Sequence, residues 1–88
     1  NDNSPFYMTV SDKFKISGVG VMITGIVKSG TINIGDTINV GDKSDCVSKI
    51  FKDNYNVQSA TVGDNVGLVL PNIKMQYIEL GMEITTIA

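Results

Sequence analysis

The fold class is decided by one stretch near the middle of the chain, Thr31-Ile32-Asn33-Ile34-Gly35-Asp36-Thr37-Ile38-Asn39-Val40. Its two halves alternate polar residues with branched apolar residues, which is the period of two of a half-buried β-strand. The pair Gly35-Asp36 lies between them and is typical of a tight turn. The stretch therefore predicts two short strands joined as a hairpin.

Strand-like segments continue on both sides of this hairpin. The longest covers residues 21–27 and is followed by Ser29-Gly30, where glycine allows the positive φ of a tight turn. The other candidate strands are residues 6–10, 14–16, 46–51, 65–70 and 82–87. Residues 75–80 could form only a short helical turn. This pattern predicts an all-β fold, a small closed antiparallel barrel of six or so strands whose closure leaves no open edge.

The alternation also separates inward from outward side chains. Met22 and Ile26 are expected to point outward, and Val69 does so between two inward leucines. Phe14 and Ile16 lie on a neighbouring stretch, so an exterior apolar patch could form a docking surface or lie partly under a loop. The expected interior residues are Val21, Ile23, Val27, Ile32, Ile34, Ile38, Val40, Val66, Leu68 and Leu70.

Length and composition limit the possible functions. The 88 residues suffice for one domain, which we place at residues 5–88 behind a polar tail at residues 1–4. The chain has no His, and all 7 of its basic residues are lysines. The usual proton shuttle and the planar phosphate-binding guanidinium are therefore absent. A net charge of −2 also disfavours a free-standing, charge-driven nucleic-acid binder.

Short motifs that suggest chemistry have simpler explanations. The run Ser17-Gly18-Val19-Gly20 lacks the third glycine of a dinucleotide loop and the Gly-Lys-Ser/Thr of a Walker loop, so a bend between strands explains it better. Cys46 is the only thiol, and we expect it to be inert and half-buried. Most of the aspartates in the middle of the chain are expected in turns, bonded to local backbone amides rather than to a metal; the set is Asp36, Asp42, Asp45, Asp53 and Asp64.

The lysines are scattered, which favours edge protection over a track for phosphates. No stretch approaches the roughly 18 apolar residues of a membrane span, so no membrane partner is expected. The single thiol and the absence of a signal-peptide pattern fit a cytoplasmic location. No catalytic residue, resident cofactor or metal ligand is expected in this chain.

The order of several motifs is more specific than any one of them. The chain resembles domain 2 of elongation factor Tu and related translational GTPases in several motifs that occur in the family's order. These are Pro5-Phe6 and residues 10–27, 28–30, 34–40, 62–68, 72–74 and 78–82. The resemblance covers nearly the whole chain and weakens only at residues 41–61. It implies a barrel with Greek-key connections, beside a separate GTPase domain that would hold GTP and magnesium.

The resemblance also implies partners and a site. In the family this barrel packs on the GTPase domain and receives the 3′ end of aminoacyl-tRNA, while related factors contact ribosomal RNA. By position, the residues that match the family's exterior pocket are Asp12, Phe14, Ile16, Met22, Asn65 and Val69. We therefore expect a non-catalytic domain of a translation factor that docks on its GTPase domain and contacts RNA.

The sequence departs from the family pattern at Val19 and Ile26, where the family usually has arginine, and it has no glutamate near residues 49–51. These differences and the acidic balance leave an alternative open. The domain could be a stand-alone protein-interaction barrel with no role in translation, because fold alone does not define function.

Overall fold

Short β-strands dominate the computed structural model, which describes residues 4–87. The all-β prediction is confirmed, and the only helix in the described residues is the 3-10 turn η1 at Met75–Tyr77, inside the predicted helical turn. Part of the predicted tail, residues 1–3, lies outside the described residues. The strands are β1 Tyr7–Thr9, β2 Asp12–Ile16, β3 Gly20–Ser29, β4 Thr31–Asn33, β5 Thr37–Val40, β6 Lys43–Cys46, β7 Lys49–Lys52, β8 Tyr55–Val57, β9 Ser59–Thr61, β10 Asn65–Leu70 and β11 Glu83–Thr86.

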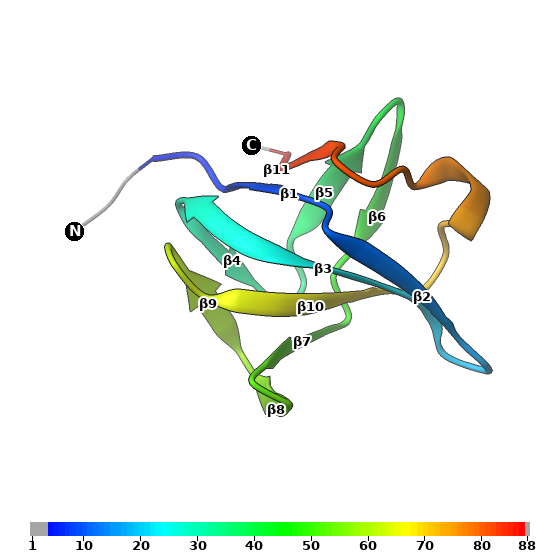
Figure 1. Ribbon diagram of the computed structural model, residues 1–88, viewed down its shortest axis with the longest axis horizontal. Coiled ribbons are helices and arrows are strands. Elements are labelled where there is room, and N and C mark those ends of the chain that lie inside the picture. Colours follow the sequence, from blue (N-terminus) through cyan, green and yellow to red (C-terminus); the bar gives the residue numbers. More distant parts are fainter. Residues whose placement is uncertain (1–3, 88) are drawn as a thin grey trace.

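The main sheet curls but does not close, so the prediction of a closed barrel of about six strands is wrong (Figure 1). Its strands follow the order β6-β5-β11-β1-β3-β10-β7-β8, with β2 added on β3, while β4 and β9 form a separate pair. The end strands β6 and β8 do not pair with each other. Strand β6 is connected to β7 by Val47 and Ser48, and these two consecutive strands do not pair with each other.

The predicted hairpin at residues 31–40 is also wrong, although its turn is present. Asn33 and Asp36 close the turn through the Asp36 N–H to Asn33 carbonyl bond at 3.0 Å, and Gly35 has a φ of 94°. Beyond the turn, β4 pairs with β9, whereas β5 pairs with β6 and β11. The segment at Val47 takes the hydrogen bonds of the turn, since Gly35 donates to Val47 and Val47 donates to Asp36.

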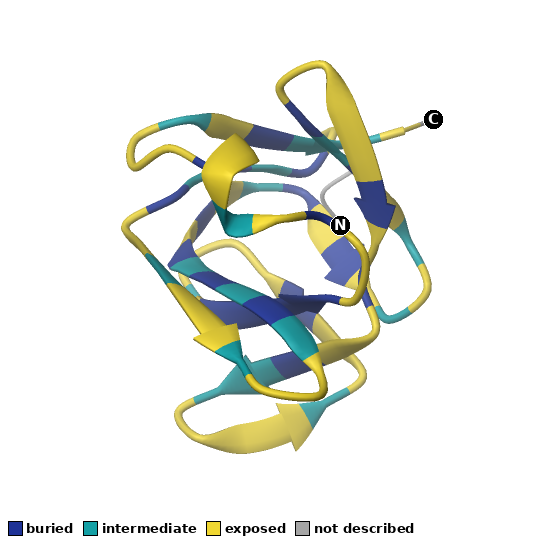
Figure 2. Cartoon of the chain, turned by 90° about the vertical axis from the view of Figure 1, so that its right-hand side faces the viewer, coloured by how far each residue is buried: buried dark blue, intermediate teal, exposed yellow. Residues whose placement is uncertain are grey.

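The core fills the concave side of the sheet, and dark blue buried positions alternate with exposed ones along the strands in Figure 2. Nine of the ten predicted interior residues are buried there, and Ile34 is the exception because it is only partly buried at the rim. Cys46 is exposed rather than half-buried, because Asp45 takes the inward position at the end of β6. No helix among residues 4–87 is long and apolar enough to cross a membrane.

Strand β3 is the common partner of three strands. Its first half pairs with β2 on one edge, its second half pairs with β1, and β10 runs along the other edge. Gly25 lies where β3 passes β1, and a methyl group on Gly25 would clash with the backbone oxygen of Thr9 and lie 2.6 Å from Met8 Cε. The absence of a side chain at Gly25 therefore lets the two strands approach closely.

Asp45 is the only buried charged or polar residue of the described chain, with 6% of its surface exposed. Its carboxylate accepts hydrogen bonds from the N–H of Asn72 at 2.7 Å, of Ile73 at 2.8 Å and of Cys46 at 2.7 Å, and from the Asn72 amide at 3.0 Å. Apart from the bond from Cys46, Asp45 therefore does not follow the local turn bonding predicted for most of the aspartates. Asp45 instead fastens β6 to the segment after β10, far away in sequence.

Burial alone would raise the pKa of Asp45, but the donors from Ile73, Asn72 and Cys46 lower the pKa below its ordinary value. Because the pKa of Asp45 is lower in the folded state than in the unfolded state, its ionised carboxylate stabilises the fold at pH values above the unfolded-state pKa. This stabilisation is lost as the pH falls through the folded-state pKa. We expect Asp45→Asn to lower the free energy of unfolding at pH 7 by about 2 kcal/mol, because amide nitrogen cannot accept these bonds. Urea unfolding of both proteins at several pH values from 7 to 3 measures this difference in the free energy of unfolding. The difference should shrink toward acid pH, and a difference that stays constant contradicts the assignment.

The inward assignment of β10 is tested by placing a charge on each side of the sheet. Val66→Asp buries an unpaired carboxylate, which costs several kcal/mol. This cost is comparable to the whole free energy of unfolding of a small domain. We expect the variant to lose its cooperative thermal transition. Ile26→Asp is the control, because Ile26 is 54% exposed on the neighbouring strand, and it should melt within a few degrees of the parent. Equal melting of both variants would show that the faces are assigned wrongly.

Candidate functional site

A row of apolar side chains crosses the outer face of the sheet. Phe14 of β2 lies opposite Met22 of β3, Met22 lies opposite Val69 of β10, and Val69 lies opposite Lys49 of β7. Residues directly opposite each other in a sheet share one face. The structure therefore brings three of the predicted site residues, Phe14, Met22 and Val69, into one row.

Val69 occupies this row without being accessible. The residue is 1% exposed, yet it is not part of the core cluster on the concave side. It lies between Met22 and Lys49, whose longer side chains can cover a short branched one. The outward direction predicted for Val69 is consistent with this register, but its expected role as an exposed contact residue is not met. Phe14, which is 45% exposed, is the accessible apolar residue of the row.

A second row beside the first contains a hollow. Asp12 lies opposite Thr24, Thr24 opposite Gly67, and Gly67 opposite Phe51. Because Gly67 has no side chain, the thioether of Met22 lies over it and buries it, and a methyl group there would lie only 2.8 Å from the sulfur of Met22. The resulting hollow of about 190 Å³ is lined by Met22, Thr24, Phe51, Asp53, Asn54, Asn65, Val66 and Gly67.

The shape and chemistry of the hollow limit its ligands. Its volume is below the roughly 300–1,000 Å³ of sites that enclose a whole small molecule, so it suits one group of a larger ligand. Met22 and the Phe51 ring offer apolar contact, while Asn65 offers an amide. Asp53 and Asn54 form the rim in a turn with φ of 52° and 70°, so polar groups lie at the entrance. A planar group with polar edges, such as a nucleobase, matches this combination.

The charges around the hollow are largely paired. Lys52 lies 3.1 Å from the Asp64 carboxylate, and Asp64 also accepts the N–H of Thr61 at 2.9 Å. The Thr61 N–H and the Lys52 ammonium lower the pKa of Asp64, so its carboxylate stays ionised near neutral pH. Lys52 is thus partly neutralised, whereas Lys49 in the first row forms no salt bridge within residues 4–87.

The remaining predicted residues are spread along the face. Asn65 lines the hollow together with Met22. Asp12 is exposed at the end of the second row and accepts the N–H of Lys13 at 2.8 Å. Ile16 lies near the β2–β3 turn and lines a different groove. Thr24, Phe51 and Gly67 were missed, although a glycine inside an apolar strand such as β10 is a sequence signal for close approach to the backbone.

These features describe an all-β accessory domain whose outer face offers a shallow binding hollow. Residues 20–85 match the family model described as "Elongation factor Tu domain 2". The chain therefore belongs to the elongation factor Tu domain 2 family, as the motif order predicted, and it is a translation-factor domain.

Two solved structures are similar over nearly the whole chain. The translation elongation factor SelB from Methanococcus maripaludis, in its apo form, has 31% identity and a TM-score of 0.86, and the match covers 98% of this chain. A bacterial selenocysteine-specific elongation factor, EF-Sec, has 24% identity and a TM-score of 0.88 over 97% of this chain. The chain spans only 19% and 15% of these two proteins, so it corresponds to one domain of each.

Two glycines on the central strands test the geometry of the hollow. Ala at Gly67 meets only the flexible end of Met22, whereas Ala at Gly25 meets the backbone of Thr9. We expect Gly67→Ala to change the free energy of unfolding by less than about 1 kcal/mol, and Gly25→Ala to lower it by about 3 kcal/mol. Urea unfolding measures both. The Met22 methyl resonance should shift in Gly67→Ala, and an unchanged resonance would show that the hollow is misplaced.

Proposed function

We propose that this chain is a non-catalytic domain that docks on the GTPase domain of an elongation-factor-Tu-like protein and contacts the 3′ end of aminoacyl-tRNA, or ribosomal RNA. The family membership and the outer-face hollow support this proposal. GTP and magnesium belong to the separate GTPase domain in this proposal, and the chain acts in the cytoplasm. The similar proteins described above are themselves elongation factors, one of them selenocysteine-specific.

The hollow at Gly67 is the observation that carries the proposal. It accepts one planar group between Met22, Phe51 and Asn65, and the chain of a bound RNA would continue over the exposed outer face. Stacking of one base on an aromatic side chain contributes about 1–3 kcal/mol. The hollow alone therefore gives weak binding, and strong capture of an RNA end requires the neighbouring GTPase domain as a second wall.

A second candidate function is a protein-interaction domain without an RNA ligand. Val19 and Ile26 stand where the family usually has arginine, and they are 45% and 54% exposed. Exposed branched apolar residues in place of cations favour a protein surface as partner over a phosphate backbone. The two functions differ in what occupies the hollow, so one titration separates them.

The test is an NMR titration of the 88-residue chain at low salt with an aminoacylated acceptor-stem RNA. We expect shifts at the Met22 methyl and at the Asn65 and Gly67 amides, with affinity in the high micromolar range or weaker. Gly67→Ala displaces the Met22 side chain, which lies over Gly67 and lines the hollow, and it should weaken binding about tenfold, which corresponds to about 1.4 kcal/mol.

Lys28→Ala is the matched control, because Lys28 is exposed on β3 and does not line the hollow. It should retain the affinity of the parent apart from a small loss from reduced charge. An absence of shifts at Met22, Asn65 and Gly67 at millimolar RNA, or equal losses in both variants, would contradict the proposal and favour the protein-interaction function.

A further inference from the structure

The second edge of β2 is open. Strand β2 pairs with β3 along Asp12–Ile16, and no other strand among residues 4–87 pairs with it. The N–H of Lys13 donates to the carboxylate of Asp12 at 2.8 Å rather than to β3. Because alternate residues of an antiparallel strand point their backbone groups to the same edge, the backbone groups of Lys15 also point away from β3. This edge can therefore accept an additional strand.

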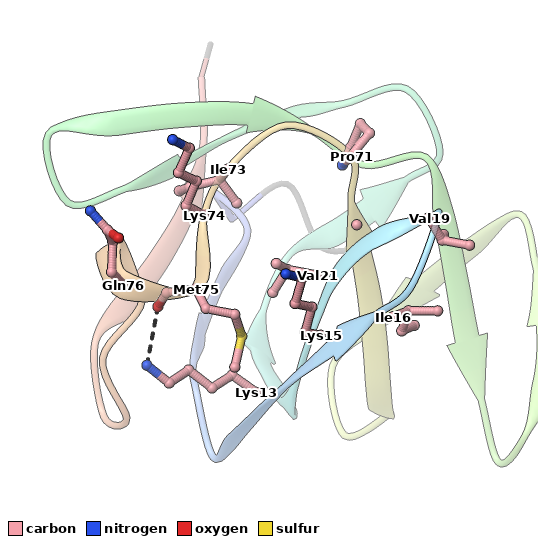
Figure 3. Close-up of a pocket in the computed structure, with 12 residues that line it drawn as sticks. Lys13, Lys15, Ile16, Val19, Val21, Pro71, Ile73, Lys74, Met75 and Gln76 are labelled. Atoms are coloured by element: carbon pink, nitrogen blue, oxygen red, sulfur yellow. Dashed lines mark hydrogen bonds between the residues drawn. The ribbon is translucent and has the colours of Figure 1, made fainter.

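A groove lies beside this edge (Figure 3). Its volume is about 790 Å³, and β2 with the start of β3 forms one wall while residues 71–76 form the other. The second wall is held in place, because Asp45 binds the N–H groups of Asn72 and Ile73. The groove is thus formed before any partner arrives, which lowers the entropic cost of binding.

The ionisable residues that line the groove are all lysines, namely Lys13, Lys15 and Lys74. Lys13 is already used, since its ammonium donates to the backbone oxygens of Met75 and Ile78. Lys15 and Lys74 are exposed and form no salt bridge within residues 4–87. The groove therefore presents two free cations beside apolar surface, in a chain whose net charge is −2.

The sequence of β2 defines which strand would fit. Lys13, Phe14, Lys15 and Ile16 alternate basic and apolar residues, so one face of the edge is basic and the other is apolar. Side chains of opposite charge directly across two strands stabilise a pair, and like charges destabilise it. A second copy of β2 would place lysines opposite lysines, which excludes self-pairing as the favoured use of the edge.

We propose that the open edge of β2 is a docking site for an extended peptide of a partner protein in which acidic and apolar residues alternate. The peptide adds one strand to the sheet through backbone hydrogen bonds at Lys13 and Lys15, and a peptide carbonyl replaces the Asp12 carboxylate at the Lys13 N–H. Its carboxylates lie toward Lys15 and Lys74, and its apolar residues lie beside Phe14 and Ile16. This site differs from the hollow at Gly67 and does not depend on the RNA function.

The experiment is an NMR titration of the 88-residue chain with a blocked peptide of sequence Glu-Val-Glu-Val-Glu. We expect downfield shifts of the Lys13 and Lys15 amide protons, with a smaller change at Phe14. Three control peptides are matched to the first. One has the same composition without alternation, Val-Glu-Glu-Glu-Val. The other two keep the original sequence and carry N-methyl groups, one on both valines and the other on both terminal glutamates, so that N–H groups on one backbone edge are blocked in each. The non-alternating peptide and one N-methylated version should bind at least about tenfold more weakly.

Variants of the protein complete the test. Lys15→Glu should weaken peptide binding about tenfold, whereas Lys28→Glu carries the same charge change away from the groove and should have a much smaller effect. Gly67→Ala should leave peptide binding unchanged, which separates this site from the RNA site. Equal binding of all peptides, equal effects of the two lysine variants, or shifts at Lys13 and Lys15 caused by the acceptor-stem RNA but not by the peptide would overturn the proposal. The N-methylated peptides keep the test decisive if Lys15→Glu does not fold.

Discussion

The antiparallel pairing of β3 with β1, β2 and β10 is the constraint on which the rest of the structure depends. This ten-residue strand belongs to the ladders of three neighbours, and its pairing with β10 extends over Asn65–Leu70. Alternation along β3 then assigns Val21, Ile23 and Val27 to the core and Met22, Thr24 and Ile26 to the outer face. A shift of one residue in this register would exchange the two faces. The register of β3 therefore determines both the core and the candidate site.

The open sheet gives the domain two separate surfaces on either side of β2. Across β3, the outer face continues to β10 and β7 and contains the hollow at Gly67. On its other edge, β2 borders the lysine-lined groove that residues 71–76 complete. One strand thus contributes Phe14 to the outer face and Lys15 to the groove. Under the function proposed above, a GTPase domain and another partner can occupy such surfaces at the same time.

Much of the fold follows from the sequence because the alternation is local information. The alternation predicted the burial of Val66 and Leu68, glycine pairs such as Gly35-Asp36 predicted turns, and the order of the motifs indicated the family. The failures are non-local. Strands β4 and β5 separate because Val47, remote in sequence, binds their turn, and Asp45 is buried because Asn72 and Ile73 surround its carboxylate. Of the residues that line the hollow, Met22 and Asn65 were predicted. Gly67 was missed for a similar reason, since its place beside Thr24 and Phe51 depends on a register that a single sequence does not specify.

Amide hydrogen exchange along β2 and β3 of the free domain tests the central claim most directly. The register requires the amides of residues 21–24 in β3 to be among the slowest, because β10 and β2 pair with both edges of the strand there. In β2, the Phe14 amide should be protected by β3, and the Lys15 amide should exchange much faster. Uniform protection along β2, or rapid exchange throughout β3, would contradict the account.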